Sequence, residues 1–326
     1  MTCFAGAHSI AEGKKLSVVT TIFPIYDWAR QVTGDSDQIE LTMLLDSGVD
    51  LHSYQPTAAD IMKIALCDVF IYVGGESDEW VDDALAEAIN PDRIVINLLE
   101  SMGDDVKIEE LIEGMEHDHN HEDDPNEDHD HDHDHDEEKD EDHEHGEEEA
   151  DEHVWLSLRN AQKLVFVIAE KLAVAYPSYA EIFQTNATAY CEALAVLDAR
   201  YGDVTGQAAC KTVLFGDRFP FRYLVDDYGL TYYAAFSGCS AESEASFATI
   251  VFLAQKVDEL NLPAVLTIEG TNHKIAETIK QTTANKNQKL LTLDSMQGVT
   301  AADVKAGTSY LAIMQANLEV LKEALN

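Results

Sequence analysis

The chain has little positive charge and no long apolar segment. Only 21 lysine and arginine residues stand against 62 aspartate and glutamate residues, which gives a formal net charge of −41. Such a field repels nucleic acids and anionic membrane surfaces and attracts cations, so nucleic-acid binding is not expected. Apolar residues nowhere run on for the roughly 18 positions that a transmembrane helix requires, so none is predicted.

Cysteine is scarce and irregularly spaced. The five residues are Cys3, Cys67, Cys191, Cys210 and Cys239, and none of them forms a Cys-x-x-Cys motif. A cysteine zinc site or a dithiol redox motif is therefore not indicated. The simpler interpretation treats them as small buried hydrophobic residues, and pairing among four of them is the alternative. Cys3, followed by small residues, also allows a lipid-anchored chain.

Short β-branched runs alternate with amphipathic segments along the chain. Strands are predicted at 16–22, 39–45, 68–74 and 93–99, and again at 211–216, 230–236, 264–270 and 289–294. Helices are predicted between them at 58–66, 79–89, 247–261 and 274–284. Such alternation is typical of parallel sheets. We therefore predict an α/β fold of two similar lobes, each a four-stranded, mainly parallel sheet with flanking helices.

Two long helical patterns lie between the two sets of strands. The first has apolar residues at spacings of three and four from Leu158 to Leu172 and stops before Pro177. The second, of about 27 residues, would be about 40 Å long, which exceeds one small lobe. This predicts an N-terminal lobe over 15–177, one long rigid linking helix over 178–205 and a C-terminal lobe over 206–326. A last amphipathic helix is predicted over 310–325.

The middle of the chain is a tract rich in histidine, aspartate and glutamate. It contains "DHDHDHDHDEEK" at 128–139, and nine of the 13 histidines lie in it. With almost no apolar residues it cannot offset its chain entropy, so we predict a disordered insertion over about 116–150 within the first lobe. One interpretation is a solubilising acidic loop. The other is low-affinity metal capture by side chains such as His129, His131, His133 and His135.

Outside the tract, a few metal-ligand residue types follow predicted strands or precede a helix. His52 lies in the loop after a strand, and Glu269 and Asp294 end two others, while His153 precedes a helix. Loops at the carboxyl ends of parallel strands are where open α/β sheets bind ligands. Two imidazoles and one or two carboxylates suit Zn²⁺ or Mn²⁺. Each residue alone is also compatible with a cap or a loop anchor.

Two motifs resemble a known family. "SGVDLHSYQPTAADI" at 47–61, followed by "CDVFIYVG", and "DEHVWLS" at 151–157 are similar to the metal-binding proteins of zinc and manganese ABC importers, the cluster 9 solute-binding proteins. In many members an acidic, His-rich insertion precedes the second motif, as it does here. The resemblance implies two four-stranded domains joined by one long helix, with the metal in the cleft between them. It also implies that His52, His153 and Asp294 are ligands.

The chain departs from the family pattern at the third ligand, which is usually histidine or glutamate. In "LFGDRFPFRYLVDDYGL" Gly216 falls where that ligand is expected. The candidates that replace it are Glu269, Asp217 and Glu242, with Cys239, Glu244 and water as further alternatives. Arg218 and Arg222 lie beside this position. A cation there would repel a metal, so we expect them to pair with Asp217, Asp226 or Asp227 and hold the loop.

These observations predict a binding protein and not an enzyme, because no HExxH or comparable hydrolase motif occurs. The predicted function is extracytoplasmic capture of Zn²⁺ in an interlobe cleft and its delivery to a cognate ABC permease in the membrane. The alternatives are a manganese-binding homologue, and a cell-surface metal buffer or adhesin in which the His-rich loop is the main binding element. The chain is expected to be a monomer, either a cell-surface lipoprotein or periplasmic.

Overall fold

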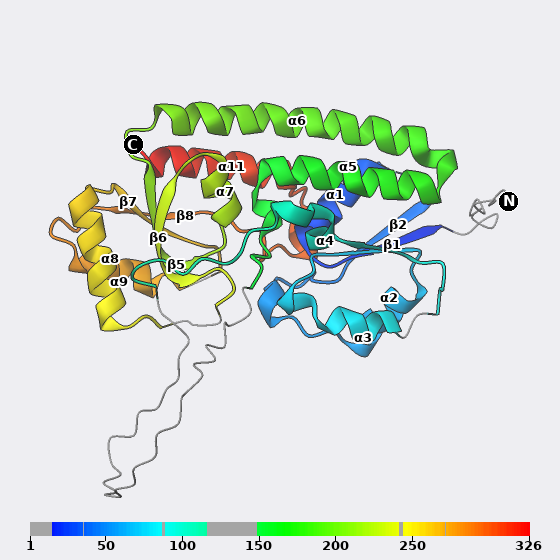
Figure 1. Ribbon diagram of the computed structural model, residues 1–326, viewed down its shortest axis with the longest axis horizontal. Helices are drawn as coiled ribbons and strands as arrows, with labels where there is room; N and C mark the ends of the chain where they lie inside the picture. The colour runs from blue at the N-terminus through cyan, green and yellow to red at the C-terminus, as the bar shows by residue number, and fades with distance from the viewer. Residues whose placement is uncertain (1–14, 35, 87–88, 116–148, 241–243, 271) are drawn as a thin grey trace, which may run out of the picture.

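Two four-stranded parallel sheets lie side by side beneath a layer of long helices (Figure 1). The computed structural model describes residues 15–34, 36–86, 89–115, 149–240, 244–270 and 272–326. The strand orders are β2-β1-β3-β4 in the N-terminal lobe and β6-β5-β7-β8 in the C-terminal lobe, so the two sheets have equivalent topology. This confirms the predicted fold class of two similar α/β lobes.

All eight predicted strands are present, and most are shorter than predicted. The first sheet contains β1 (Leu16–Thr20), β2 (Ile39–Met43), β3 (Val69–Tyr72) and β4 (Ile94–Asn97). The second contains β5 (Thr212–Phe219), β6 (Thr231–Ser237), β7 (Ala264–Thr267) and β8 (Lys289–Thr292). The central strands β3 and β7 are buried at every position, as expected for a parallel sheet covered on both faces.

Helices cover both faces of each sheet. They are α1 (Phe23–Thr33), α2 (Ala58–Leu66), α3 (Trp80–Ala86), α4 (Leu98–Met102), α5 (Leu158–Ala175), α6 (Ala180–Gln207), α7 (Arg222–Asp227), α8 (Phe247–Leu260), α9 (Lys274–Thr282), α10 (Ala301–Lys305) and α11 (Tyr310–Ala324). The sequence analysis did not include α1. Its Pro24 stands in the first turn, where no intrahelical N–H is needed, and therefore does not break the helix.

The linking helix α6 spans 28 residues and lies above both lobes, within two residues of its predicted bounds (Figure 1). One stripe of it is buried, at Phe183, Ala187, Leu194 and Tyr201 among others. These side chains pack on α5, α1 and α11, so the helix is fixed along most of its length rather than spanning solvent. No helix in the described residues has the length and apolar character to cross a membrane.

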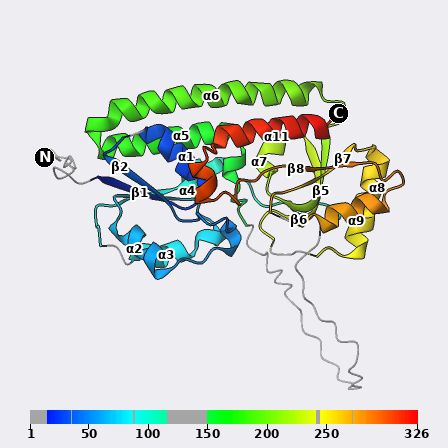
Figure 2. The ribbon, with the colours of Figure 1, turned by 180° about the vertical axis from the view of Figure 1, so that it is seen from behind.

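Two segments reach from one lobe onto the other. α11 lies beside α6 in both views and also contacts α1, where the Tyr310 amide donates to the Asp27 carboxylate at 2.9 Å (Figure 2). The segment before the acidic tract passes over the second lobe, where Gly114 lies against the ring of Phe252. The lobe boundaries at 177 and 205 remain predictions, because the chain crosses between lobes at more than one point.

The acidic insertion falls mostly at 116–148, which lies outside the described residues, as do its histidines. Its two flanks are described. Ile108 and Ala150 form an antiparallel bridge, and the Glu109 amide donates to the Glu149 carbonyl at 2.8 Å. The segments on either side of the insertion therefore run side by side at 108–109 and 149–150.

Gly216 in β5 provides a test of the packing between a strand and its covering helix. A Cβ at this position would lie 2.5 Å from the Cα of Ala276 in α9. We expect Gly216→Ala to lower the free energy of unfolding by about 1–3 kcal/mol, because α9 must move away from the sheet. Gly202→Ala in α6, where the new Cβ meets nothing within 4 Å, should raise it by about 0.4–1 kcal/mol. Urea unfolding checks both, and an unchanged midpoint for Gly216→Ala would contradict the packing.

Candidate metal centre

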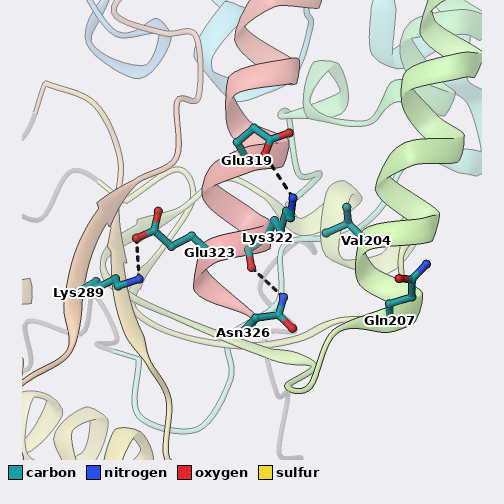
Figure 3. Close-up of a pocket in the computed structure, with 7 residues that line it drawn as sticks. All are labelled: Val204, Gln207, Lys289, Glu319, Lys322, Glu323 and Asn326. Atoms are coloured by element: carbon teal, nitrogen blue, oxygen red, sulfur yellow. Dashed lines mark hydrogen bonds and ion pairs between the residues drawn. The ribbon is translucent and has the colours of Figure 1, made fainter.

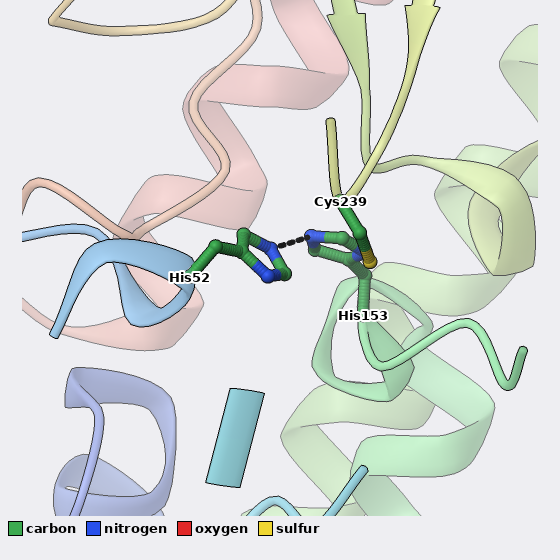
Figure 4. A group of neighbouring side chains, drawn as sticks. All are labelled: His52, His153 and Cys239. Carbon is green, nitrogen blue, oxygen red and sulfur yellow. Dashed lines mark hydrogen bonds between the residues drawn. The ribbon is translucent and has the colours of Figure 1, made fainter. Parts of the chain in front are cut away.

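The two histidines predicted as ligands meet between the lobes. The Nε2 atoms of His52 and His153 lie 3.1 Å apart, and the rings point toward each other (Figure 4). Residues 101 positions apart in the chain are therefore brought together by the fold. We call these two residues the histidine pair.

His52 lies in a short 3-10 helix (Leu51–Ser53) that follows β2. Asp50 caps this helix by accepting from the His52 amide at 3.0 Å. The Nδ1 of His52 lies 2.7 Å from the Ser77 hydroxyl and 3.6 Å from a Glu152 carboxylate oxygen. These neighbours orient the ring through Nδ1, so that Nε2 faces His153. Burial, followed by the proximity of His153, lowers the pKa of His52 from 6.5 to about 3. Its imidazole is therefore neutral at physiological pH and suited to bind a metal.

His153 is completely buried and is fixed through its neighbours. Asp151 accepts from its amide at 2.9 Å and lies 3.1 Å from its Nδ1. Hydrogen bonds across the lobes hold the same segment, because the Tyr223 hydroxyl donates to the Asp151 carbonyl and the Trp155 indole donates to the Ser295 carbonyl. A carboxylate behind a ligating imidazole is a common arrangement at metal sites, since it orients the ring.

Cys239 is the third member of the group. Among the described residues, ligand atoms of His52, His153 and Cys239 all lie within 4.8 Å of one another (Figure 4). The sequence analysis named Cys239 only as one of several substitutes, because a lone cysteine without a second one nearby carries no metal signal. Burial, followed by the charges of Glu109 and Glu152, raises the pKa of its thiol.

Asp294 and Glu269 lie on the second lobe and outside this group. Glu269 accepts from the Ser295 amide, the Ser295 hydroxyl and the Gln297 amide at 2.7, 2.8 and 3.0 Å, so its carboxylate organises the loop after β8. Asp294 accepts from the Met296 amide at 2.7 Å. Burial, followed by the charge of Glu269, raises the pKa of Asp294 to about 6. Its role as a ligand stays a prediction.

The residues at the end of β5 have structural partners. A side chain at Gly216 would point into α9, so this position does not face the histidine pair and Gly216 is not a ligand lost from it. Asp217 accepts from the Ile268 amide at 3.2 Å and from the Arg218 amide at 2.9 Å, which agrees with an anchoring role for its carboxylate.

The two arginines of this region differ. Arg222 pairs with Asp226 at 2.7 Å, as predicted, and with Glu110 at 3.1 Å. The guanidinium of Arg218 instead pairs with Asp50 of the other lobe at 2.6 Å, which contradicts the predicted pairing within its own loop. The sequence does not reveal this contact, because the two residues meet only when the lobes pack.

Glu242 and the histidines at 129, 131, 133 and 135 lie outside the described residues.

A cleft of about 190 Å³ opens between the lobes, and it is lined by Asp50, which stands two residues before His52 in the chain. Its lining includes Gly48 and Asp50 from the first lobe and Arg218, Glu269 and Gln297 from the second. A wider groove of about 630 Å³ lies between α6 and α11 (Figure 3). Its charged side chains pair with each other, as Lys289 does with Glu323 at 2.8 Å, so the interlobe cleft is the better candidate for metal entry.

A known protein family matches nearly the whole chain. The family described as "Zinc-uptake complex component A periplasmic", ZnuA, matches residues 18–324. The chain belongs to this family. This confirms the resemblance given above and places the chain in a family described by zinc uptake.

Individual relatives are similar over nearly the whole chain. The zinc-binding lipoprotein AdcA of Streptococcus pneumoniae is 34% identical over 317 residues, which is 96% of this chain and 56% of AdcA. The chain thus spans about half the length of the streptococcal relatives. The high-affinity zinc uptake system protein ZnuA of Bacillus subtilis is 30% identical over 315 residues, covering 97% of this chain and 89% of that protein.

Solved structures share the fold. The zinc-bound ZnuA-like domain of S. pneumoniae AdcA matches with a TM-score of 0.70 at 29% identity, over 95% of this chain and 99% of that domain. The metal-dependent lipoprotein YcdH of B. subtilis matches with a TM-score of 0.72 at 26% identity, over 95% and 99%. The laminin-binding protein of Streptococcus agalactiae, at 22% identity and a TM-score of 0.71, shares the fold alone.

The depressed pKa of His52 predicts how the metal-free protein responds to acid. The unfolded chain takes up a proton at this position near pH 6.5, whereas the folded chain does so only near pH 3. Stability is therefore present above pH 6.5 and falls as the pH decreases toward 3, by up to about 1.4 kcal/mol per pH unit from this residue. We expect His52→Asn to give a shallower loss between about pH 7 and about pH 5. Urea unfolding with a chelator measures it, and equal slopes would contradict the buried, neutral His52.

Proposed function

We propose that this protein captures Zn²⁺ between its lobes and delivers it to the permease of an ABC importer. The observation that carries the proposal is the pair of buried imidazoles whose Nε2 atoms face each other at 3.1 Å while their Nδ1 atoms are held from behind. Tetrahedral zinc holds two imidazole nitrogens about 3.3 Å apart, so an ion enters this pair with a small displacement of the rings. The names of the relatives, zinc-binding and zinc-uptake proteins, support the choice of metal.

The proposed ligands come from different segments of the chain, which explains how a bound zinc ion can restrain these segments. His52 follows β2, whereas His153 lies on the segment that Tyr223 and Ser295 of the second lobe hold in place. A bound ion restrains these segments together, while the packed α6 limits how far the lobes separate. Zinc at about 100 times its dissociation constant adds about 2.7 kcal/mol to stability.

The acidic insertion is compatible with an accessory role in the same function. Its flanks meet at Glu109 and Glu149, and Glu109 also accepts from the amide of Cys239 at 3.0 Å. The insertion is thus attached beside the histidine pair. Weak binding by its histidines and carboxylates raises the local concentration of metal at the cleft. An adhesin function is not proposed, because the laminin-binding relative shares the fold alone.

The proposed setting follows from the relatives. They are described as periplasmic or lipoprotein components, which supports a site of action outside the cytoplasm for this chain. We propose that it acts there on a membrane permease, as the monomer expected from the sequence. Zinc uptake that requires both this protein and a permease distinguishes transport from simple buffering of metal at the cell surface.

The first test is a competitive Zn²⁺ titration of the full chain and of a chain lacking residues 116–148. Both should bind one ion tightly, and His52→Ala should weaken that site by at least about 100-fold, since even groups that only orient ligands contribute about 10- to 100-fold. His273→Asn is the matched control, because asparagine tolerates the left-handed backbone at that position (φ 54°). Loss of all tight binding with the insertion would contradict the interlobe site and favour a metal buffer.

The predicted Asp294 ligand is tested in the same titration. Asp294→Asn removes the carboxylate charge and should weaken zinc binding by at least about tenfold, or about 1.4 kcal/mol. Glu269→Gln is the comparison, because that carboxylate is engaged with the loop at 295–298. An unchanged zinc affinity in Asp294→Asn would remove Asp294 from the ligand set and leave the histidine pair intact.

A further inference from the structure

We infer that Cys239 is a metal ligand of this site, binding the ion through its thiolate together with His52 and His153. The inference rests on the proposed function and deepens it, because it replaces the histidine or glutamate expected as the third ligand by a sulfur donor. The ion is then held by residues of both lobes.

The first support is distance. Zinc binds imidazole nitrogen at about 2.0–2.1 Å and thiolate sulfur at about 2.3 Å, so a tetrahedral ion separates the two donors by about 3.6 Å. The ligand atoms of His52, His153 and Cys239 lie within 4.8 Å of one another. Figure 4 shows the Cys239 side chain beside the His153 ring, from the strand end of the second lobe. Side-chain movements of about 1 Å bring these atoms to the separations that tetrahedral zinc requires.

The second support is the backbone that carries the cysteine. A Cβ on Gly238 would lie 2.9 Å from Cε1 of His153 and 3.0 Å from the Phe219 carbonyl oxygen. The residue before Cys239 therefore needs to be glycine for the loop to lie against the imidazole. On the other side, the Cys239 amide donates to Glu109 at 3.0 Å. The loop is thus held against His153 from two directions, which fixes the cysteine at the site.

The third support is the equivalence of the two lobes. β2 and β6 occupy the same edge position in their sheets, in the orders β2-β1-β3-β4 and β6-β5-β7-β8. His52 follows β2, and Cys239 follows β6. The carboxyl ends of parallel strands present their loops at one edge of the sheet. Each lobe thus offers one donor from the corresponding loop, and His153 lies between them.

The other described cysteines have different surroundings. Cys67 and Cys191 are buried among apolar side chains, with exposed fractions of 0% and 6%. Cys210 is partly exposed, and its Sγ lies 3.3 Å from the Thr212 amide. These three behave as small hydrophobic or loop residues, whereas Cys239 adjoins two imidazoles. Among the described residues, Cys191, Cys210 and Cys239 are free thiols.

The chemistry of the set selects the metal. When the ion binds, it takes the place of the Cys239 proton, which leaves to solvent, and the thiolate offsets one of the two positive charges. Two imidazoles and one thiolate form a soft, nitrogen- and sulfur-rich shell that favours Zn²⁺ over Mn²⁺, which prefers oxygen donors. The sequence predicted zinc, with manganese as the alternative, and a Cys239 ligand favours zinc on chemical grounds.

The experiment uses Co²⁺ as a spectroscopic substitute for Zn²⁺ on the full chain. Only a thiolate ligand gives an intense sulfur-to-cobalt charge-transfer band in the near ultraviolet. We expect the first equivalent of Co²⁺ to produce this band in the wild-type chain and in Cys210→Ser, the matched control, and not in Cys239→Ser. Zinc affinity should fall by at least about tenfold in Cys239→Ser, and the preference for Zn²⁺ over Mn²⁺ should shrink.

The outcomes separate this inference from the proposed function. Tight zinc binding that His52→Ala abolishes, without a sulfur band in the wild-type chain, would overturn the Cys239 ligand and leave the function standing. A wild-type chain that binds neither Co²⁺ nor Zn²⁺ tightly would overturn both. The wild-type spectrum alone decides the presence of a sulfur ligand, so the test stands even if a variant fails to fold.

Discussion

The structure depends on one buried contact, the 3.1 Å approach of two imidazole nitrogens from segments far apart in the chain. Two neutral rings tolerate this proximity, but two charged rings do not. Burial, and after it the proximity of His153, lowers the pKa of His52 to about 3. Each ring is oriented from behind, His52 by Ser77 and His153 by Asp151, so the facing nitrogens are prepared for a shared cation. A metal ion bound by both nitrogens would replace the hydrogen bond between the two rings. The cost in side-chain entropy would be small, because both rings are already oriented.

The packing around this contact explains how the two imidazoles are held in place. The segment carrying His153 is attached to the second lobe through Tyr223 and Ser295, and the long helix α6 covers both lobes. The ion pair between Asp50 and Arg218 adds a polar connection across the cleft. The lobes are therefore joined both at the helical layer and beside the histidine pair.

The charge of the chain determines which ions it attracts. The chain is strongly acidic, and the half-buried carboxylates of Asp294 and Glu269 lie near each other. Burial, and after it the charge of Glu269, raises the pKa of Asp294 to about 6. Negative charge concentrated near a cleft attracts divalent cations and repels anions. The nitrogen and sulfur donors that we propose at the centre would then discriminate among the cations that arrive. Attraction and selection are thus carried out by different residues.

By itself, the sequence determined the elements and the family: the alternation of strands and helices, the 28-residue helix α6 and the histidine motifs are local patterns. Three features were decided only by tertiary structure. Gly216 faces α9 rather than the site, Arg218 pairs with Asp50 of the other lobe, and Cys239 lies beside His153. None of these leaves a local signal, because each depends on where a loop lies after two lobes have packed. A cysteine 86 residues from its neighbouring histidine becomes part of a site only through that packing.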